Sequence, residues 1–297
     1  MQQNIAATGP VVIGGVGGSG TRVVAEVVDQ FGFYIGEDLN AAKDNCSFMV
    51  LFKRPGWYRK NSHDKNKIFT GLSLFSKVML RRKMPKWPEL KFLLQAVLEV
   101  SLFGHNHQGE GRGIWPFLRA WHMLAGRMGC NSNKIGWGWK EPNTHIYLDY
   151  IAAYYSSLRY IYLIRHGLDM AFSNNQQQLY NWGPLFGVEA PHSKAEEPAA
   201  SLKYWLRANR QVLQAGRKLG QQKFMLVKFE DLCLDPEPVI QKIISFLSLA
   251  PSAEKLAAAM CIPQKPKSIG RYRLHDQSRF DPADIKAVED LGFPMDF

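Results

Sequence analysis

The sequence lacks the long apolar run that a membrane-spanning helix requires. None of its 297 residues belong to a stretch of about 18 consecutive apolar residues. The first four residues, Met-Gln-Gln-Asn, do not show the basic-then-apolar pattern of a secretory signal. Cysteine is scarce, and the four cysteines form no C-x-x-C pair: Cys46, Cys130, Cys233 and Cys261. We therefore expect a cytoplasmic protein with neither a structural zinc site nor a disulfide framework.

Acidic residues are too few to balance the basic ones, and the formal net charge is +11. Such a charge favours anionic ligands, of which nucleic acid is the first to consider. The basic residues, however, do not form one continuous stripe, and no nucleic-acid-binding motif occurs in the sequence. We therefore expect a smaller anionic ligand and no nucleic acid as partner.

Five extended apolar runs alternate with helical periods along much of the chain. The runs cover residues 11–14, 33–35, 135–140, 160–164 and 224–228. Helical spacing of apolar residues follows in the segments 202–213 and 239–247. This alternation predicts an α/β fold of three layers, with a central parallel sheet flanked by helices. Ligands of such sheets bind beyond the carboxyl ends of the strands.

Two stretches depart from this rhythm. Residues 48–130 are rich in Lys, Arg, Trp, Pro and Gly, with one clear helical period at 90–102. We interpret them as a helical and irregular insertion between core strands. It would cover the ligand site and form a lid that binds an anionic or sugar-like substrate. Residues 176–198 are predicted to form a loop near the mouth of the site. The whole chain, residues 1–297, is predicted to be a single domain with this insertion.

The first apolar run ends in a glycine-rich loop, Gly14-Gly15-Val16-Gly17-Gly18-Ser19-Gly20-Thr21-Arg22. Apolar residues at helical spacing follow it and stop near Gly32, so the order is strand, tight loop and helix. Glycines let the backbone approach an anion, and a helix start offers unpaired N–H groups. The loop is therefore predicted to bind a phosphate.

Two common phosphate-binding motifs fit this loop in part. The spacing of Gly15 and Gly20 is that of an ATP/GTP P-loop, but Thr21 replaces the lysine of that motif. Gly15-x-Gly17-x-x-Gly20 also satisfies the dinucleotide fingerprint, with Glu37 and Asp38 near the distance of a ribose-binding acid. An NAD(P)-dependent oxidoreductase is therefore an alternative, and a non-catalytic basic protein that binds anions is another.

Polar or aromatic residues follow the later strands as well. Lys140 and Glu141 end the third run, Arg165 follows the fourth with Ser173 about two helical turns later, and Phe229 follows the fifth. Arginine offers a fork of donors to a phosphate, serine offers a hydroxyl, and an aromatic ring can stack on adenine.

Together, the glycine loop, Trp-Lys140-Glu-Pro, Arg165…Ser173 and Phe229-Glu-Asp-Leu resemble the sulfotransferases that use 3′-phosphoadenosine-5′-phosphosulfate (PAPS). Their order and spacing are most similar to the tyrosylprotein sulfotransferases and related bacterial enzymes. The resemblance covers four blocks between about residues 11 and 273, and the insertion lies outside it.

The resemblance implies a PAPS site and a role for each matching residue. The 5′-phosphosulfate would lie on the loop formed by Gly17, Gly18, Ser19, Gly20, Thr21 and Arg22. Arg165 and Ser173 would hold the 3′-phosphate, and Phe229 would contact the adenine. Ser268, Gly270 and Arg271 belong to a late basic loop that would close over the 3′-phosphate. The product would be 3′,5′-bisphosphoadenosine (PAP), and the scheme requires no metal.

The resemblance also implies the catalytic residues. Glu37 matches the carboxylate base of the tyrosylprotein branch, and Lys140 matches the lysine that contacts the reacting sulfate. His145 and Glu141 are the alternative bases. The family usually carries a basic residue where this chain has Gly18, and Arg22 or Lys140 would have to replace that charge. The acceptor stays open between a saccharide, a phenol and a peptide.

Overall fold

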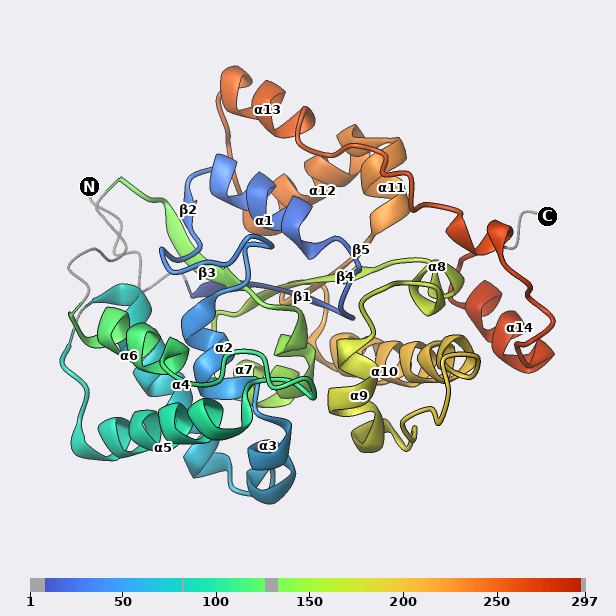
Figure 1. Ribbon diagram of the computed structural model, residues 1–297. Coiled ribbons are helices and arrows are strands. Elements are labelled where there is room, and N and C mark those ends of the chain that lie inside the picture. The colour runs from blue at the N-terminus through green and yellow to red at the C-terminus, as the bar shows by residue number, and fades with distance from the viewer. Residues whose placement is uncertain (1–8, 82, 126–132, 295–297) are drawn as a thin grey trace.

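A central parallel sheet organises the molecule (Figure 1). The structure is a computed structural model that describes residues 9–81, 83–125 and 133–294. Within these ranges the sheet has five strands in the order β2-β3-β1-β4-β5. Their bounds are β1 Pro10–Gly15, β2 Phe33–Tyr34, β3 Gly136–Lys140, β4 Arg159–Ile164 and β5 Phe224–Lys228. All five apolar runs therefore form strands, as predicted.

Strand register brings the predicted site residues to one edge. On its two sides, β1 pairs in parallel with β3 and β4, so that Ile13 lies opposite Lys140 and Gly15 opposite Leu163. Next, Ile164 of β4 pairs with Lys228 of β5. The glycine loop, Lys140, Arg165 and Phe229 consequently leave the sheet at the same carboxyl edge.

The two faces of the sheet carry separate apolar clusters. Alternate residues such as Ile13 and Leu163 pack with helices α1 (Thr21–Gln30), α12 (Pro236–Leu247) and α13 (Ala253–Met260). Residues of opposite parity, such as Val12 and Tyr162, face the other cluster. That cluster includes helices α7 (Leu148–Tyr154) and α10 (Glu197–Leu219). The predicted three-layer α/β fold is therefore confirmed, with helices above and below the sheet in Figure 1.

The segment predicted as an insertion is more helical than we expected. Within its described residues it contains α2 (Cys46–Phe52), α3 (Pro55–Asn61), α4 (Lys65–Leu80), α5 (Trp87–Phe103) and α6 (Trp115–Ala125). It also packs into the core. Phe48 of α2 stacks on Trp139 with ring centroids 5.6 Å apart, and Phe75 of α4 meets the same ring edge-on at 4.9 Å. The segment thus covers one face of the sheet.

The remaining elements connect and close the sheet. After β3 comes the 3₁₀ helix η2 (Pro142–Tyr147), and after β4 come α8 (Gly167–Ala171), α9 (Gln177–Trp182) and the 3₁₀ helix η3 (Gly183–Phe186). The stretch predicted as a loop at 176–198 therefore contains α9 and η3. Beyond β5 lie α11 (Phe229–Leu234), the 3₁₀ helix η4 (Arg271–Leu274) and α14 (Pro282–Asp290).

Three of the four cysteines are free thiols, Cys46, Cys233 and Cys261, and Cys130 lies outside the described residues. Among the helices that the structure describes, none combines the length and apolar character needed to cross a membrane.

Candidate functional site

The glycine loop forms a cradle of backbone N–H groups between β1 and α1. A turn is closed by the Ser19 amide, which donates to the Val16 carbonyl at 3.1 Å. Gly20 caps the start of α1 with a left-handed φ of +86°. The Ser19 hydroxyl is buried and makes no hydrogen bond to any described residue. An unpaired buried hydroxyl beside a helix N-terminus fits an anionic group that would accept from it.

Phe229 closes the cradle from the side of β5. A Cβ atom on Gly20 would lie 2.1 Å from Cε2 of the Phe229 ring, which is far inside van der Waals contact. Glycine is thus required at this position by both its φ and its space. The ring also lies under the Arg165 guanidinium, at 4.9 Å from centroid to Cζ. The sequence-predicted adenine contact and the phosphate loop are therefore neighbours.

Arg165 links the cradle to the late basic loop. Its guanidinium donates to the Gly18 carbonyl at 3.3 Å and to the carbonyl and hydroxyl of Ser268 at 2.7 and 2.9 Å. Its Nε atom is buried without a hydrogen-bond partner. Burial lowers the pKa of Arg165 from its usual value, and the nearby Asp169 opposes that shift. The guanidinium remains charged because an arginine pKa starts far above neutrality.

Asp169 fixes the late loop in place. It accepts from the Gly270 amide at 2.8 Å and from the Tyr272 amide at 3.2 Å. Arg271 in turn donates to the Ser268 carbonyl at 3.3 Å. The structure therefore assembles Arg165, Ser268, Gly270 and Arg271 as one cluster, although more than 100 residues separate Arg165 from the other three in the chain.

Ser173 lies beside the cradle at Gly18. A Cβ atom on Gly18 would lie 3.7 Å from the Ser173 Oγ and 3.1 Å from the Met170 Cε. With its φ of +89°, Gly18 is in a conformation that a side chain strains. A basic residue would not fit here without a change in the loop. Arg22, the proposed substitute for that charge, is 59% exposed and lies 4.0 Å from Glu26.

Lys140 and Glu141 follow β3 and lie deep in the site. Lys140 is buried, donates to the Ala42 carbonyl at 2.9 Å and forms an ion pair with Asp44. Glu141 accepts from the backbone N–H and the side-chain amide of Asn143 at 2.7 and 2.6 Å. Burial raises the pKa of Glu141 to about 7, and the Asp44 carboxylate adds to the shift.

A cleft of about 680 Å³ joins the cradle to these two residues. Gly17, Gly18, Gly20, Thr21 and Arg22 line it from one side, and Lys140, Glu141 and Phe229 line it as well. Several lining residues were absent from our sequence prediction, and they are Asp44, Lys53, Asn143, Gln178 and Lys265. Of these residues, Lys53 was the easiest to predict from the sequence, because it belongs to a pair of consecutive basic residues in the insertion.

Gln178 and Asn143 show why the local sequence did not predict these lining residues of the cleft. The Gln178 amide donates to Asn143 Oδ1 at 2.9 Å, and the Trp182 indole donates to the same oxygen at 2.8 Å. These contacts join α9 to η2 across more than 30 residues. Their role in the cleft therefore depends on tertiary structure alone.

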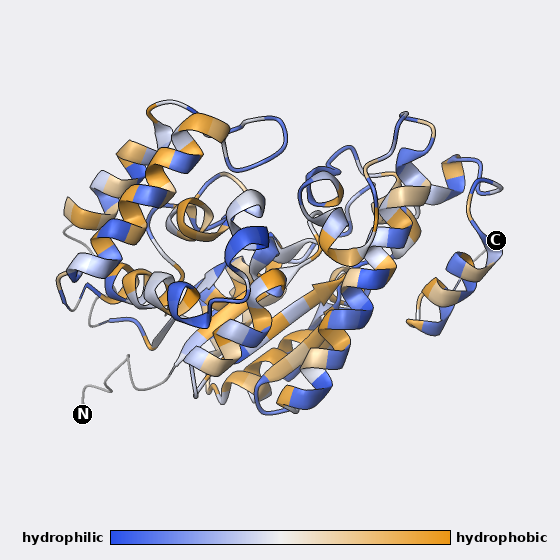
Figure 2. Ribbon diagram, turned by 90° about the horizontal axis from the view of Figure 1, so that it is seen from below, coloured by the Kyte–Doolittle hydropathy of each residue, from blue (hydrophilic) through white to orange (hydrophobic). Residues whose placement is uncertain are grey.

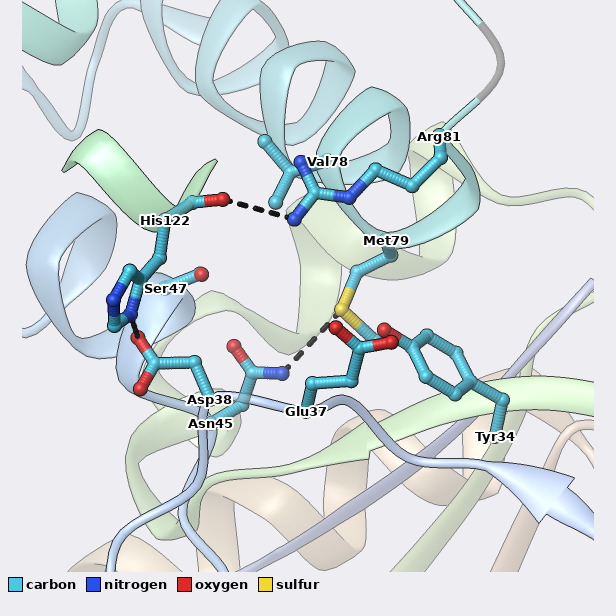
Figure 3. A pocket seen from close by; sticks show the side chains of 9 residues that line it. All are labelled: Tyr34, Glu37, Asp38, Asn45, Ser47, Val78, Met79, Arg81 and His122. Carbon is cyan, nitrogen blue, oxygen red and sulfur yellow. Dashed lines mark hydrogen bonds and ion pairs between the residues drawn. The ribbon is translucent and has the colours of Figure 1, made fainter. Parts of the chain in front are cut away.

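Glu37 lies in a different cavity of about 340 Å³, shown in Figure 3. It is exposed, and it shares that cavity with Tyr34, Asp38, Arg81 and His122. Asp38 is paired with Arg119 at 2.5 Å, and Arg81 donates to carbonyls of α6. Glu37 is not among the residues that line the cleft of the cradle. Its role as a base stays a prediction.

His145 is buried on the far side of η2. Its Nδ1 atom lies 2.8 Å from the Pro142 carbonyl oxygen, and its Nε2 atom lies 3.4 Å from the Tyr204 hydroxyl. Burial lowers the pKa of His145 to about 4, so that the ring is neutral at pH 7. It lines a third cavity with Tyr58 and Lys65, away from the cradle. In the described part of the chain, His, Cys, Asp and Glu side chains form no cluster suited to a metal ion.

Comparison with known proteins identifies the family. Residues 10–253 match the model of the sulfotransferase family, which is more than half of the chain. This protein belongs to the sulfotransferase family. No protein with a curated description matches this sulfotransferase.

Solved structures of bacterial sulfotransferase domains resemble it in fold. One is the sulfotransferase domain from the curacin biosynthetic pathway, at 12% identity and a TM-score of 0.50, with 97% of this chain and 99% of that chain covered. Another is the sulfotransferase domain of the Synechococcus PCC 7002 olefin synthase, at 16% identity and a TM-score of 0.49, with 97% and 96% covered. At such identities the likeness concerns the fold alone.

Proposed function

We propose that this sulfotransferase transfers a sulfuryl group from PAPS to a hydroxyl or amine of an acceptor. The observation that carries the proposal is the shared cleft, because the anion cradle, Lys140 and Phe229 all open onto it. A nucleotide with phosphate groups at both ends of its ribose needs two anion sites with an aromatic ring near them. The cradle is one such site, and the cluster of Arg165 and Ser268 is the other.

In this proposal the residues divide the donor between them. The cradle N–H groups and the Ser19 hydroxyl hold the 5′-phosphosulfate, and Thr21 and Arg22 extend that site. Arg165 and Ser173 hold the 3′-phosphate, with Ser268, Gly270 and Arg271 closing over it. Phe229 contacts the adenine. The 3′-phosphate site distinguishes PAPS from ATP and from NAD.

The reaction is an in-line displacement at sulfur. The acceptor oxygen or nitrogen forms a bond to sulfur while the bond between sulfur and the bridging oxygen breaks, and PAP leaves with the electron pair. Lys140 and the cradle stabilise the negative charge that grows on the leaving phosphate. Positioning of donor and acceptor supplies much of the rate.

Glu37 takes the proton of the acceptor in this scheme. Its carboxylate is exposed, whereas both oxygens of Glu141 are hydrogen-bonded and buried. Because Glu37 does not line the cleft of Lys140, this role requires an acceptor that extends from the cavity of Glu37 into that cleft. We assign Glu141 to positioning of Lys140 and η2. The acceptor is a saccharide, a phenol or a peptide, and a mass-spectrometric screen with labelled PAPS would identify it.

Calorimetric titration with PAP tests the donor site. We expect Arg165→Ala to weaken PAP binding by about 1.5–3 kcal/mol, since a charge-assisted hydrogen bond to phosphate is lost. Binding of adenosine 5′-phosphosulfate, which lacks the 3′-phosphate, should change little. Arg159→Ala is the matched control. Arg159 is the first residue of β4, the strand that Arg165 follows, and its guanidinium lies over the Phe246 ring outside the cleft.

Two results would contradict the proposal. Equal losses of both ligands in Arg165→Ala would mean that the residue acts through the fold of the loop. Tight binding of NAD with weak binding of PAP would favour the oxidoreductase alternative.

A further inference from the structure

Exposed apolar side chains are concentrated on one helix of the insertion. Along α5, four large residues recur on the face that points away from the core, and they are Trp87, Leu94, Leu98 and Leu102. Their spacings of seven, four and four residues place them on one side of a helix. The opposite side of α5, including Phe92 and Val97, is buried. Helix α5 is therefore apolar on both sides, although among the described residues only one side is buried.

Helix α6 continues this surface. Only Pro116 and Met123 of its eleven residues are buried. Four of its large apolar side chains and the residue before it are exposed, and they are Ile114, Phe117, Leu118, Trp121 and Leu124. Trp121 is 68% exposed, and Trp87 at the start of α5 is 76% exposed. Monomeric proteins rarely expose so many large apolar residues together, and such patches mark interaction sites.

The two helices form one continuous surface. They pack against each other, and Ser101 of α5 is joined to Gly113 by hydrogen bonds of 3.0 and 2.8 Å. In the ribbon of Figure 2, apolar (orange) and polar (blue) residues alternate along the helices at the left, where Figure 1 places α4, α5 and α6. We call the exposed large apolar side chains of α5 and α6, together with Ile114, the α5–α6 face.

Charge around the α5–α6 face has one dominant sign. Lys83, Lys86 and Arg112 are exposed on its borders, Lys91 is exposed among its apolar residues, and Glu110 is the exposed acid of the segment that joins the two helices. Neither acid of α5 is free in solvent, because Glu89 is buried against Lys77 and the half-buried Glu99 is paired with Arg54. The face therefore combines apolar side chains, two indole rings and a basic border.

We propose that the α5–α6 face docks on the surface of an anionic lipid bilayer. Leucine and phenylalanine side chains enter the boundary of the acyl chains, and tryptophan rings lie at the level of the headgroups. The basic border binds the phosphate groups of anionic lipids, each lysine or arginine contributing favourably near the surface. A protein partner would not require a basic border with no exposed acid on α5, and a second copy of this chain would bring like charges together.

Docking in this way places an existing cavity beside the membrane. His122 of α6 lines the cavity that contains Glu37, one residue after the exposed Trp121. An acceptor held at the lipid surface would therefore have a short path to that cavity. The docking itself does not depend on the proposed reaction.

Vesicle co-sedimentation of the full chain, without nucleotide, tests the proposal. We use vesicles of phosphatidylcholine alone and of equal parts phosphatidylcholine and phosphatidylglycerol. We expect binding to the anionic vesicles that falls by about tenfold or more in the double variant Leu98→Glu/Trp121→Glu. Leu185→Glu/Leu234→Glu is the matched control, because both are exposed leucines outside the face and the double variant adds the same two negative charges. It should bind as the wild-type protein does.

Circular dichroism verifies that each variant is folded, and PAP binding is measured separately. Three results would overturn the proposal. The first is that the wild-type protein does not bind anionic vesicles or binds both kinds of vesicle equally. The second is that the double variant binds anionic vesicles as well as the wild-type protein does, and the third is a dimer of the wild-type protein that the double variant no longer forms. Loss of vesicle binding with PAP binding intact concerns the face alone, whereas failure of PAP binding concerns the proposed function.

Discussion

At the scale of single residues, two carboxylates have environments that suit different roles. Glu37 is exposed in its own cavity, and Glu141 is buried between Lys140 and Asn143. A general base must reach the proton of the acceptor and must be free to bind it. Exposure of the carboxylate therefore favours Glu37 as the base, whereas proximity to Lys140 favours Glu141, because Glu141 lines the same cleft as Lys140 and Glu37 does not.

Replacing each carboxylate by its amide separates these roles. Glu37→Gln keeps the size of the side chain but accepts no proton, so kcat should fall by about 10²–10⁴ with PAP affinity unchanged. Glu141→Gln keeps the hydrogen bonds of Asn143 in part, and we expect a much smaller change in kcat. Steady-state kinetics with a sulfated reporter product checks both. An inactive Glu141→Gln beside a fully active Glu37→Gln would show that the base is misassigned.

At the scale of elements, the loop between β2 and α2 controls the environment of Lys140. A bridge between Leu39 and Asn45 closes this loop, and the Asn45 amide donates to the Lys140 carbonyl at 2.9 Å. Asn40 holds Asp44 by a hydrogen bond of 3.0 Å. The loop thereby places the Asp44 carboxylate on the ammonium group of Lys140, the group that we propose contacts the reacting sulfate.

Removal of that carboxylate should strengthen donor binding. Asp44→Asn leaves Lys140 its bond to the Ala42 carbonyl but removes a negative charge from the cleft in which we propose that a polyanion binds. We expect PAP to bind about tenfold more tightly, measured by calorimetry, because one repulsive interaction at short range is lost.

The control for this change is Asp29→Asn. Asp29 forms a similar ion pair with Lys134 at 3.0 Å, but neither residue lines the cleft. An equal gain in affinity from Asp29→Asn would reduce the effect to net charge. No gain from Asp44→Asn would mean that Asp44 orients Lys140 rather than competing for it.

The elements also show where sequence-based prediction succeeds. The strands were predictable because each is a short apolar run bounded by polar residues or glycine. The glycine loop was predictable because five of the seven residues 14–20 are glycines. Helix α2 was not, since all seven of its residues are buried and no polar side alternates with an apolar one. Without that periodicity a short helix gives no signal.

The site follows the same rule. Arg165, Ser173 and Phe229 follow predicted strands, so the shared edge of a parallel sheet brings them together. Asp44 reaches Lys140 across 96 residues of chain, and no local pattern encodes that contact. The separation of Glu37 from the main cleft likewise depends on the path of the 38–45 loop.

At the scale of the whole molecule, the buried carboxyl of Glu141 links folding to pH. Its pKa is raised from 4.5 to about 7, so the folded protein binds this proton more tightly than the unfolded chain does. Its contribution to stability is therefore fully present below about pH 4.5 and is lost as the pH rises to about 7. Other groups also titrate over this range, and a variant that lacks only this carboxyl removes their contribution from the comparison.

Denaturant unfolding of the wild-type protein and of Glu141→Gln at pH 5 and pH 8 measures this linkage. The glutamine never ionises, so the free energy of unfolding of the wild-type protein should fall relative to the variant between these two pH values. The expected change in the difference is at most about 3 kcal/mol, from the size of the pKa shift. His145, with its lowered pKa, is present in both proteins and cancels. A difference that stays constant with pH would mean that Glu141 is ionised in the folded protein at both pH values. The positive charges of Lys140 and Lys53 would then stabilise its carboxylate.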